Sequence, residues 1–86
     1  MAPTQVLLEL AQLPSQPFRI HVSDGSHYDV RHPDFCMVGV RTTSIWVPPD
    51  QSGGPDRYVR IDNLHITRLE PLPAPTNPAG NGQPGA

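Results

Sequence analysis

The chain has 86 residues, a formal net charge of −2 and a single cysteine, Cys36. This length allows one small domain, and such domains bury only about 60% of their unfolded surface and often need a disulfide, a metal or a partner subunit. The lone cysteine excludes a disulfide within the chain, so we expect self-association to supply the support. The acidic balance argues against binding to duplex DNA through bulk electrostatics.

The N-terminal segment carries no export signature, because residues 1–13 contain no Lys or Arg and their apolar run is interrupted by Glu9. No segment approaches the ~20 apolar residues that a membrane span needs. We therefore expect a cytoplasmic protein without a membrane partner. All six basic residues are arginines, which we interpret as a compositional bias of the source proteome and not as selection for anion recognition.

The first predicted element is a short helix that begins at Thr4, as N-cap, and ends before Pro14. About ten residues are marginal as an isolated helix, so its apolar side must pack on the rest of the domain. Leu8 lies off that side and is left for a rim or partner contact. The apolar side is formed by residues at helical spacing: Val6, Leu7, Leu10, Ala11 and Leu13.

Residues 17–33 predict a β-hairpin, and its register follows from the apolar pattern. A two-residue turn at Asp24-Gly25 would mix polar and apolar side chains on both faces. A three-residue loop closed by Gly25 in the left-handed conformation makes one face apolar throughout. That register pairs Val22 with Ser26, Ile20 with Tyr28 and Phe18 with Val30. The opposite, outer face then carries Arg19, His21, His27 and Asp29.

The second half of the domain predicts three further strands after a bend at Pro33-Asp34 and a buried apolar segment over residues 35–40. These strands cover residues 42–47, 57–62 and 64–69, and a loop over 48–56 separates the first two. Trp46 faces away from Thr43, Ile45 and Val47. The predicted fold is mainly β: a short N-terminal helix followed by a five-stranded antiparallel, strongly bent sheet or a small barrel over residues 1–72. Residues 73–86 form a Pro/Gly-rich tail that we expect to be disordered.

The strand pattern resembles that of Sm-like barrels. FRIHVSDG, YDV, Asp34 and TTSIWV are similar to the first motif of that family, and YVRIDNLHITRLE is similar to the second. The resemblance implies a small barrel and an RNA contact near Arg60 and Asn63. The chain departs from the family where Phe35 follows Asp34 and where Ile61 replaces a glycine. The string PFRIHVSDG…YDVRHPDF…TRLEPL also resembles small bacterial proteins of unassigned function, which implies a fold and no activity.

The sequence favours neither a catalytic site nor a metal site. Cys36 lies near His32 and Asp34, but a buried structural cysteine explains the FCMV segment better than a nucleophile does. His21 and His27 face each other in the predicted hairpin, yet the spacing of the histidines matches no zinc motif. We therefore expect no catalytic residue, metal ligand or cofactor.

Two functions from different classes remain. The preferred hypothesis is a non-enzymatic small barrel that self-associates through its fourth and fifth strands and presents a protein-binding face. The alternative is a single-stranded RNA-binding protein, because single strands are held by stacking on aromatic rings and by a few cations. The residues expected to contact RNA are Trp46, Arg60, Asn63 and Arg68.

Overall fold

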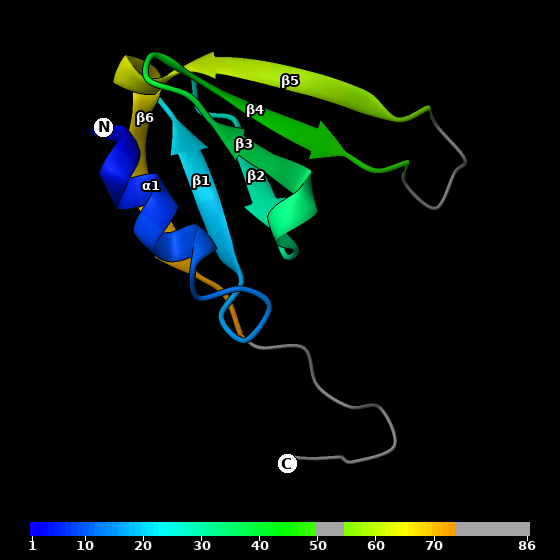
Figure 1. Ribbon diagram of the computed structural model, residues 1–86. Coiled ribbons are helices and arrows are strands. Elements are labelled where there is room, and N and C mark those ends of the chain that lie inside the picture. Colours follow the sequence, from blue (N-terminus) through cyan, green and yellow to red (C-terminus); the bar gives the residue numbers. More distant parts are fainter. Residues whose placement is uncertain (50–54, 74–86) are drawn as a thin grey trace, which may run out of the picture.

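The computed structural model describes residues 1–49 and 55–73 and shows a mainly β fold with one short N-terminal helix (Figure 1). Within these residues, six antiparallel strands form two three-stranded sheets, with strand orders β2-β1-β6 and β3-β4-β5. In chain order the elements are α1 (Pro3–Leu10), β1 (Phe18–Val22), β2 (His27–Val30), η1 (Pro33–Phe35), β3 (Cys36–Val38), β4 (Thr42–Val47), β5 (Arg57–Asp62), η2 (Asn63–His65) and β6 (Ile66–Pro71).

The expectation of five strands in a single bent sheet or a closed barrel is wrong. The 3₁₀ turn η1 separates β2 from β3, and each of these short strands is an edge strand of a different sheet. Residues 35–40 were predicted to be one buried segment, but only Cys36–Val38 is a strand. Within the segment, Met37 and Val40 are 75% and 86% exposed, so the prediction of burial is wrong for these two residues. The pairing of β3 with β4 keeps Cys36 inside and turns Met37 outward.

The hairpin of β1 and β2 has the predicted register, with Phe18 opposite Val30 and Ile20 opposite Tyr28. Gly25 closes the turn at a φ of 91°, and its N–H donates to the carbonyl of Val22. Only glycine adopts this conformation without strain, which explains why the turn falls there.

The helix is shorter than predicted and begins two residues earlier. Its N-cap is Ala2, with no side-chain cap, and Pro3 occupies the first turn, so the assignment of Thr4 as N-cap is wrong. Val6 is fully buried, Leu10 and Leu13 pack against the core, and Leu7 is 49% exposed. No helix in the described part of the chain is long and apolar enough to cross a membrane.

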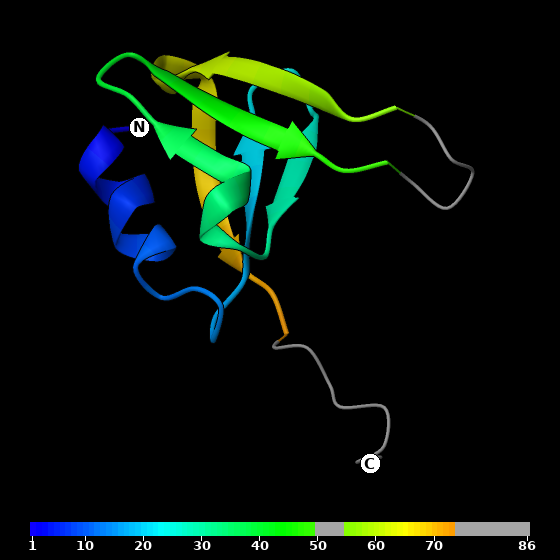
Figure 2. The ribbon, with the colours of Figure 1, turned by 45° about the vertical axis from the view of Figure 1, so that its right-hand side comes forward.

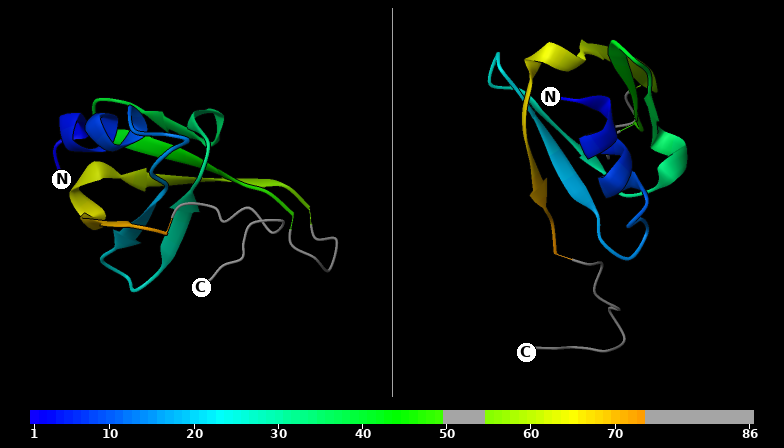
Figure 3. Two further views of the ribbon diagram at one scale, coloured as in Figure 1. Left: turned by 90° about the horizontal axis from the view of Figure 1, so that it is seen from below. Right: turned by 60° about the vertical axis from the view of Figure 1, so that its left-hand side comes forward.

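The core lies between the two sheets, and α1 covers one side of it in contact with β3 (Figures 2 and 3). The turned view in the right half of Figure 3 separates the sheets, with α1 between them. Burial of these side chains is the main stabilising contribution of the fold. The core cluster contains Val6, Phe18, Ile20, Val30, Cys36, Ile45, Ile61 and Ile66.

Strands β4 and β5 have the predicted bounds, whereas the last strand does not. It runs over Ile66–Pro71 instead of residues 64–69, because the 3₁₀ turn η2 occupies Asn63–His65 and the Asp62 carboxylate accepts the N–H of Leu64. Leu72 is buried and its N–H donates to the carbonyl of Pro17. The predicted tail beyond residue 73, and residues 50–54 of the predicted loop, lie outside the described residues.

Candidate functional site

The outer face of the β2-β1-β6 sheet is a polar ladder, which we call the hairpin face: Arg19, His21, His27, Asp29, Arg68 and Glu70. Its first row joins Asp29, Arg19 and Glu70, and its second row joins His27, His21 and Arg68. Arg19 donates to both carboxylate oxygens of Asp29, at 2.6 and 3.2 Å. The hydrogen bond from Arg19 lowers the pKa of Asp29, which therefore stays ionised at neutral pH.

The two histidines of the hairpin face lie near each other but have different partners. Their ring centroids are 6.0 Å apart, and His21 Nε2 lies 2.7 Å from a carboxylate oxygen of Glu70. This hydrogen bond lowers the pKa of Glu70. Arg68 lies 3.3 Å from the same ring nitrogen. The described residues contain no group of three or more His, Cys, Asp or Glu side chains that would hold a metal ion.

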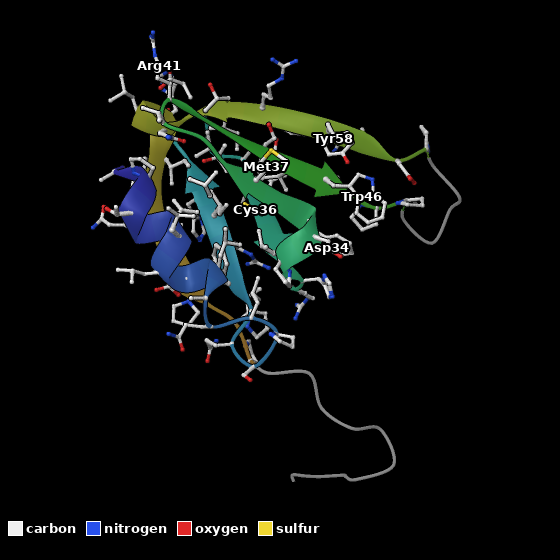
Figure 4. The ribbon with its side chains drawn as sticks, in the orientation of Figure 1. Asp34, Cys36, Met37, Arg41, Trp46 and Tyr58 are labelled. Atoms are coloured by element: carbon white, nitrogen blue, oxygen red, sulfur yellow. The ribbon has the colours of Figure 1, made fainter. Side chains whose placement is uncertain are left out.

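A second candidate surface lies on the outer face of the β3-β4-β5 sheet, and we call it the aromatic face. It consists of Phe35, Met37, Trp46, Tyr58 and Arg60. Trp46 and Tyr58 are cross-strand neighbours, and Met37 and Tyr58 are each 75% exposed (Figure 4). The ring of Phe35 meets Trp46 in an edge-to-face contact with centroids 4.5 Å apart. This contact holds the indole in a defined orientation, because edge-to-face aromatic pairs are favourable by ~0.5–1.5 kcal/mol.

The four residues expected to contact RNA are not brought together. Trp46 and Arg60 share the aromatic face, whereas Arg68 lies on the hairpin face of the other sheet. Asn63 is only 4% exposed, and its side chain makes its hydrogen bonds inside the molecule. Its amide oxygen accepts the hydroxyl of Thr43 at 2.7 Å, and its amide nitrogen donates to the carbonyls of Gly39 and Val40 at 3.0 and 3.2 Å.

Cys36 is buried at the start of β3, as expected for a structural cysteine. Desolvation raises the pKa of its thiol to about 11, so the thiol stays protonated at neutral pH. His32 is occupied elsewhere, since its Nδ1 accepts the N–H of Asp34 at 3.2 Å. The FCMV segment therefore brings together no activated nucleophile and base.

A groove of about 460 Å³, which sequence reasoning missed, opens beside β2. It is lined on one side by His27, Tyr28, Asp29 and Arg31, and on the other by residues of η1, the end of β4 and the start of β5. We call it the edge groove, and its other lining residues are Phe35, Ile45, Trp46, Val47, Pro48, Pro49 and Arg57. Nothing in the sequence could have located it, because its two sides come from different sheets.

Comparisons of the chain with models of protein families, with curated proteins and with solved structures find no match. The functional interpretation therefore depends on the surfaces of the chain itself: the hairpin face, the aromatic face and the edge groove.

Proposed function

We propose that this chain is a non-enzymatic interaction module that self-associates by pairing the free edge of β5 in one copy with that of β6 in another. The observation that carries the proposal is the sheet topology. Each of these strands has six residues and, within the described part of the chain, a single strand partner: β4 for β5 and β1 for β6. Free strand edges present unpaired N–H and C=O groups and are ready templates for another chain.

Exposed apolar side chains at the corner between the two strands support this proposal. Leu64, in the turn that joins β5 to β6, is 84% exposed, and Val40 in the neighbouring loop is 86% exposed. Both line one shallow hollow of about 420 Å³ together with Met1 and Pro3. Burying such side chains on association is favourable by ~25 cal/mol per Å² of apolar surface.

The mass of the protein in solution tests the proposal. Salt screens interactions between charges but not strand pairing or apolar burial. Light scattering at micromolar concentration is therefore expected to give a multimer in both 0.1 M and 1 M sodium chloride. A monomer at that concentration contradicts self-association.

A pair of proline variants tests whether the interface includes the free edge of β5. Along an edge strand, successive N–H groups point alternately to the neighbouring strand and to the free edge. Of Tyr58→Pro and Val59→Pro, the variant that loses the free-edge donor is expected to keep the far-ultraviolet spectrum of the fold and to become monomeric. Thr67→Lys on β6 is the independent variant, since an exposed lysine on an edge opposes strand addition. Multimers of unchanged mass in all three variants would remove these edges from the interface.

A second candidate function, binding of single-stranded RNA, is favoured by one observation: Trp46 and Tyr58 are neighbours on an open sheet face that also carries Arg60. Aromatic rings on a sheet stack unpaired bases, and each base contributes ~1–3 kcal/mol. Eight-residue oligouridine and oligoadenine are expected to bind with an affinity that falls steeply with salt and with Arg60→Ala. The matched control is Arg68→Ala on the other sheet, and absent or salt-insensitive binding contradicts this candidate.

A further inference from the structure

We propose that the edge groove binds an extended peptide of a partner protein, which adds as a strand to β2 and places an acidic side chain between Arg31 and Arg57. This inference gives a site to the interaction role proposed above, but it does not depend on self-association.

The groove follows the edge of β2. His27, Tyr28 and Asp29 are successive residues whose side chains point alternately to opposite faces of the sheet, and all three line the same hollow. A hollow bordered by both faces of a strand lies along its edge. Its described lining includes no residue of β1, so this is the edge that β1 leaves open.

The backbone of β2 suits strand addition. The strand reads HYDV, without proline, glycine or lysine, and its four residues match a short peptide segment. In this binding mode the main-chain hydrogen bonds give affinity, and pockets for alternate side chains give specificity.

The opposite side of the groove offers an apolar pocket. Phe35 and Trp46 hold each other in the edge-to-face contact described above, while Val47 and Tyr28 are half-buried against the core. Rigid aromatic residues lose little conformational entropy on binding and are enriched among the residues that dominate binding energy. An aliphatic or aromatic side chain of the peptide fits here.

The charges of the groove select an anion. Asp29 is its only acidic lining residue among those described, and both oxygens of that carboxylate are already bonded to Arg19. Arg31 is 3.8 Å from Asp29, with its side chain 50% exposed, and Arg57 has no ion-pair partner within residues 1–49 and 55–73. Two guanidinium groups beside an apolar pocket favour a carboxylate, which each binds through its paired N–H donors.

The test starts from a phage-displayed library of random eight-residue peptides selected on the full chain. The selected peptides are expected to share an acidic residue near an apolar one. One of them is then synthesised in four forms: unchanged, with glutamine or asparagine in place of the acid, and with N-methyl groups on alternate residues in each of the two possible registers. Binding is followed by the fluorescence of Trp46, which is the only tryptophan and lines the groove.

The unchanged peptide is expected to shift the emission of Trp46, and Arg31→Gln or Arg57→Gln should weaken its binding about fivefold, the size of a partly exposed charge pair. The amide form should bind equally to the original protein and to both variants. N-methylation should abolish binding in one of its two alternating registers. Arg41→Gln, on a loop outside the groove, is the matched control and should leave the affinity for the peptide unchanged.

Three results would overturn the inference: selected peptides without an acidic residue, binding that is indifferent to both arginine variants, or binding that survives N-methylation in both registers. Displacement of the peptide by eight-residue oligouridine would instead assign the groove to RNA. Because these measurements use fluorescence and the self-association test uses mass, failure of one leaves the other intact.

Discussion

Asn63 gives the sharpest test of how the turn η2 is held against the β3-β4-β5 sheet. Its side chain connects η2 to β4 through the hydroxyl of Thr43 and to the preceding loop through the carbonyls of Gly39 and Val40. We predict that Asn63→Ala destabilises the fold strongly, because it removes three hydrogen bonds at one buried position.

The magnitude follows from the exposure of each partner. Thr43 is fully buried, so its hydroxyl would lose its partner without access to water, at a cost of ~1–3 kcal/mol. Gly39 and Val40 are exposed, and their carbonyls regain water, which limits each loss to ~0.5–1 kcal/mol. The sum is about 3 kcal/mol. Domains of this size have only about 5 kcal/mol in total, so the variant is expected to keep about 2 kcal/mol and to unfold at less than half the urea concentration that unfolds the original protein.

Urea unfolding followed by the fluorescence of Trp46 measures the effect, and Thr43→Val completes a double-mutant cycle. Thr43→Val alone should cost about 1–2 kcal/mol, since it leaves one amide oxygen without a donor. The double variant should lose at least about 1 kcal/mol less than the two single variants added together, because no orphaned hydroxyl remains in it. A loss below about 1 kcal/mol for Asn63→Ala, or strict additivity, would refute the structural role assigned to this amide.

Three further predictions concern the hairpin and the core. Gly25→Ala should cost ~1–2 kcal/mol through its positive φ alone, because nothing lies within 4 Å of the added Cβ, and Gly25→Asn should cost less; equal urea midpoints would contradict the assigned turn. Cys36 should react with iodoacetamide at pH 8 only when urea unfolds the chain, and rapid alkylation of the folded protein would be inconsistent with a buried thiol of pKa about 11. The pKa values of Asp24, Asp29 and Glu70 are lowered by their hydrogen bonds with Ser26, Arg19 and His21, so their stabilising effect is present above pH ~4, where the unfolded carboxyls ionise, and is lost as the pH falls through the folded values. The urea concentration at the midpoint of unfolding should therefore decrease when the pH is lowered below 4, and this decrease should be smaller in Asp29→Asn. An equal decrease in the variant would show that the ion pair of Asp29 with Arg19 does not contribute to it.

The elements predicted correctly are those whose pattern is local. The register of the hairpin is encoded within residues 18–30, where Phe18, Ile20 and Val30 must share a face and Gly25 must close the turn. The bounds of β4 and β5 also follow from simple alternation. In each case the relevant side chains lie within a few residues of one another.

The failures come from contacts between distant segments. β3 is a strand because it pairs with β4, and nothing in CMV alone distinguishes it from a buried turn. Asn63 was expected at the surface from its position in a motif, but Thr43 and the loop before β4 enclose it. Arg68 and Glu70 join the hairpin face only because β6 pairs with β1. The alternation of Arg68, Leu69 and Glu70 would have indicated this face if the pairing of the first strand with the last had been predicted.

The two sheets have four edge strands in the described part of the chain, and these strands differ in length and in what lies beside them. β3 has three residues and contacts α1, whereas β2 borders the edge groove. β5 and β6 are the longest edges and belong to different sheets. The pairing proposed between copies would therefore be heterologous, and would build a ring if the rotation closes and an open filament if it does not. A peptide on β2 uses neither of them. Its binding should therefore leave the mass of the assembly unchanged, and a peptide that dissociates the multimer would have to compete for β5 or β6 instead.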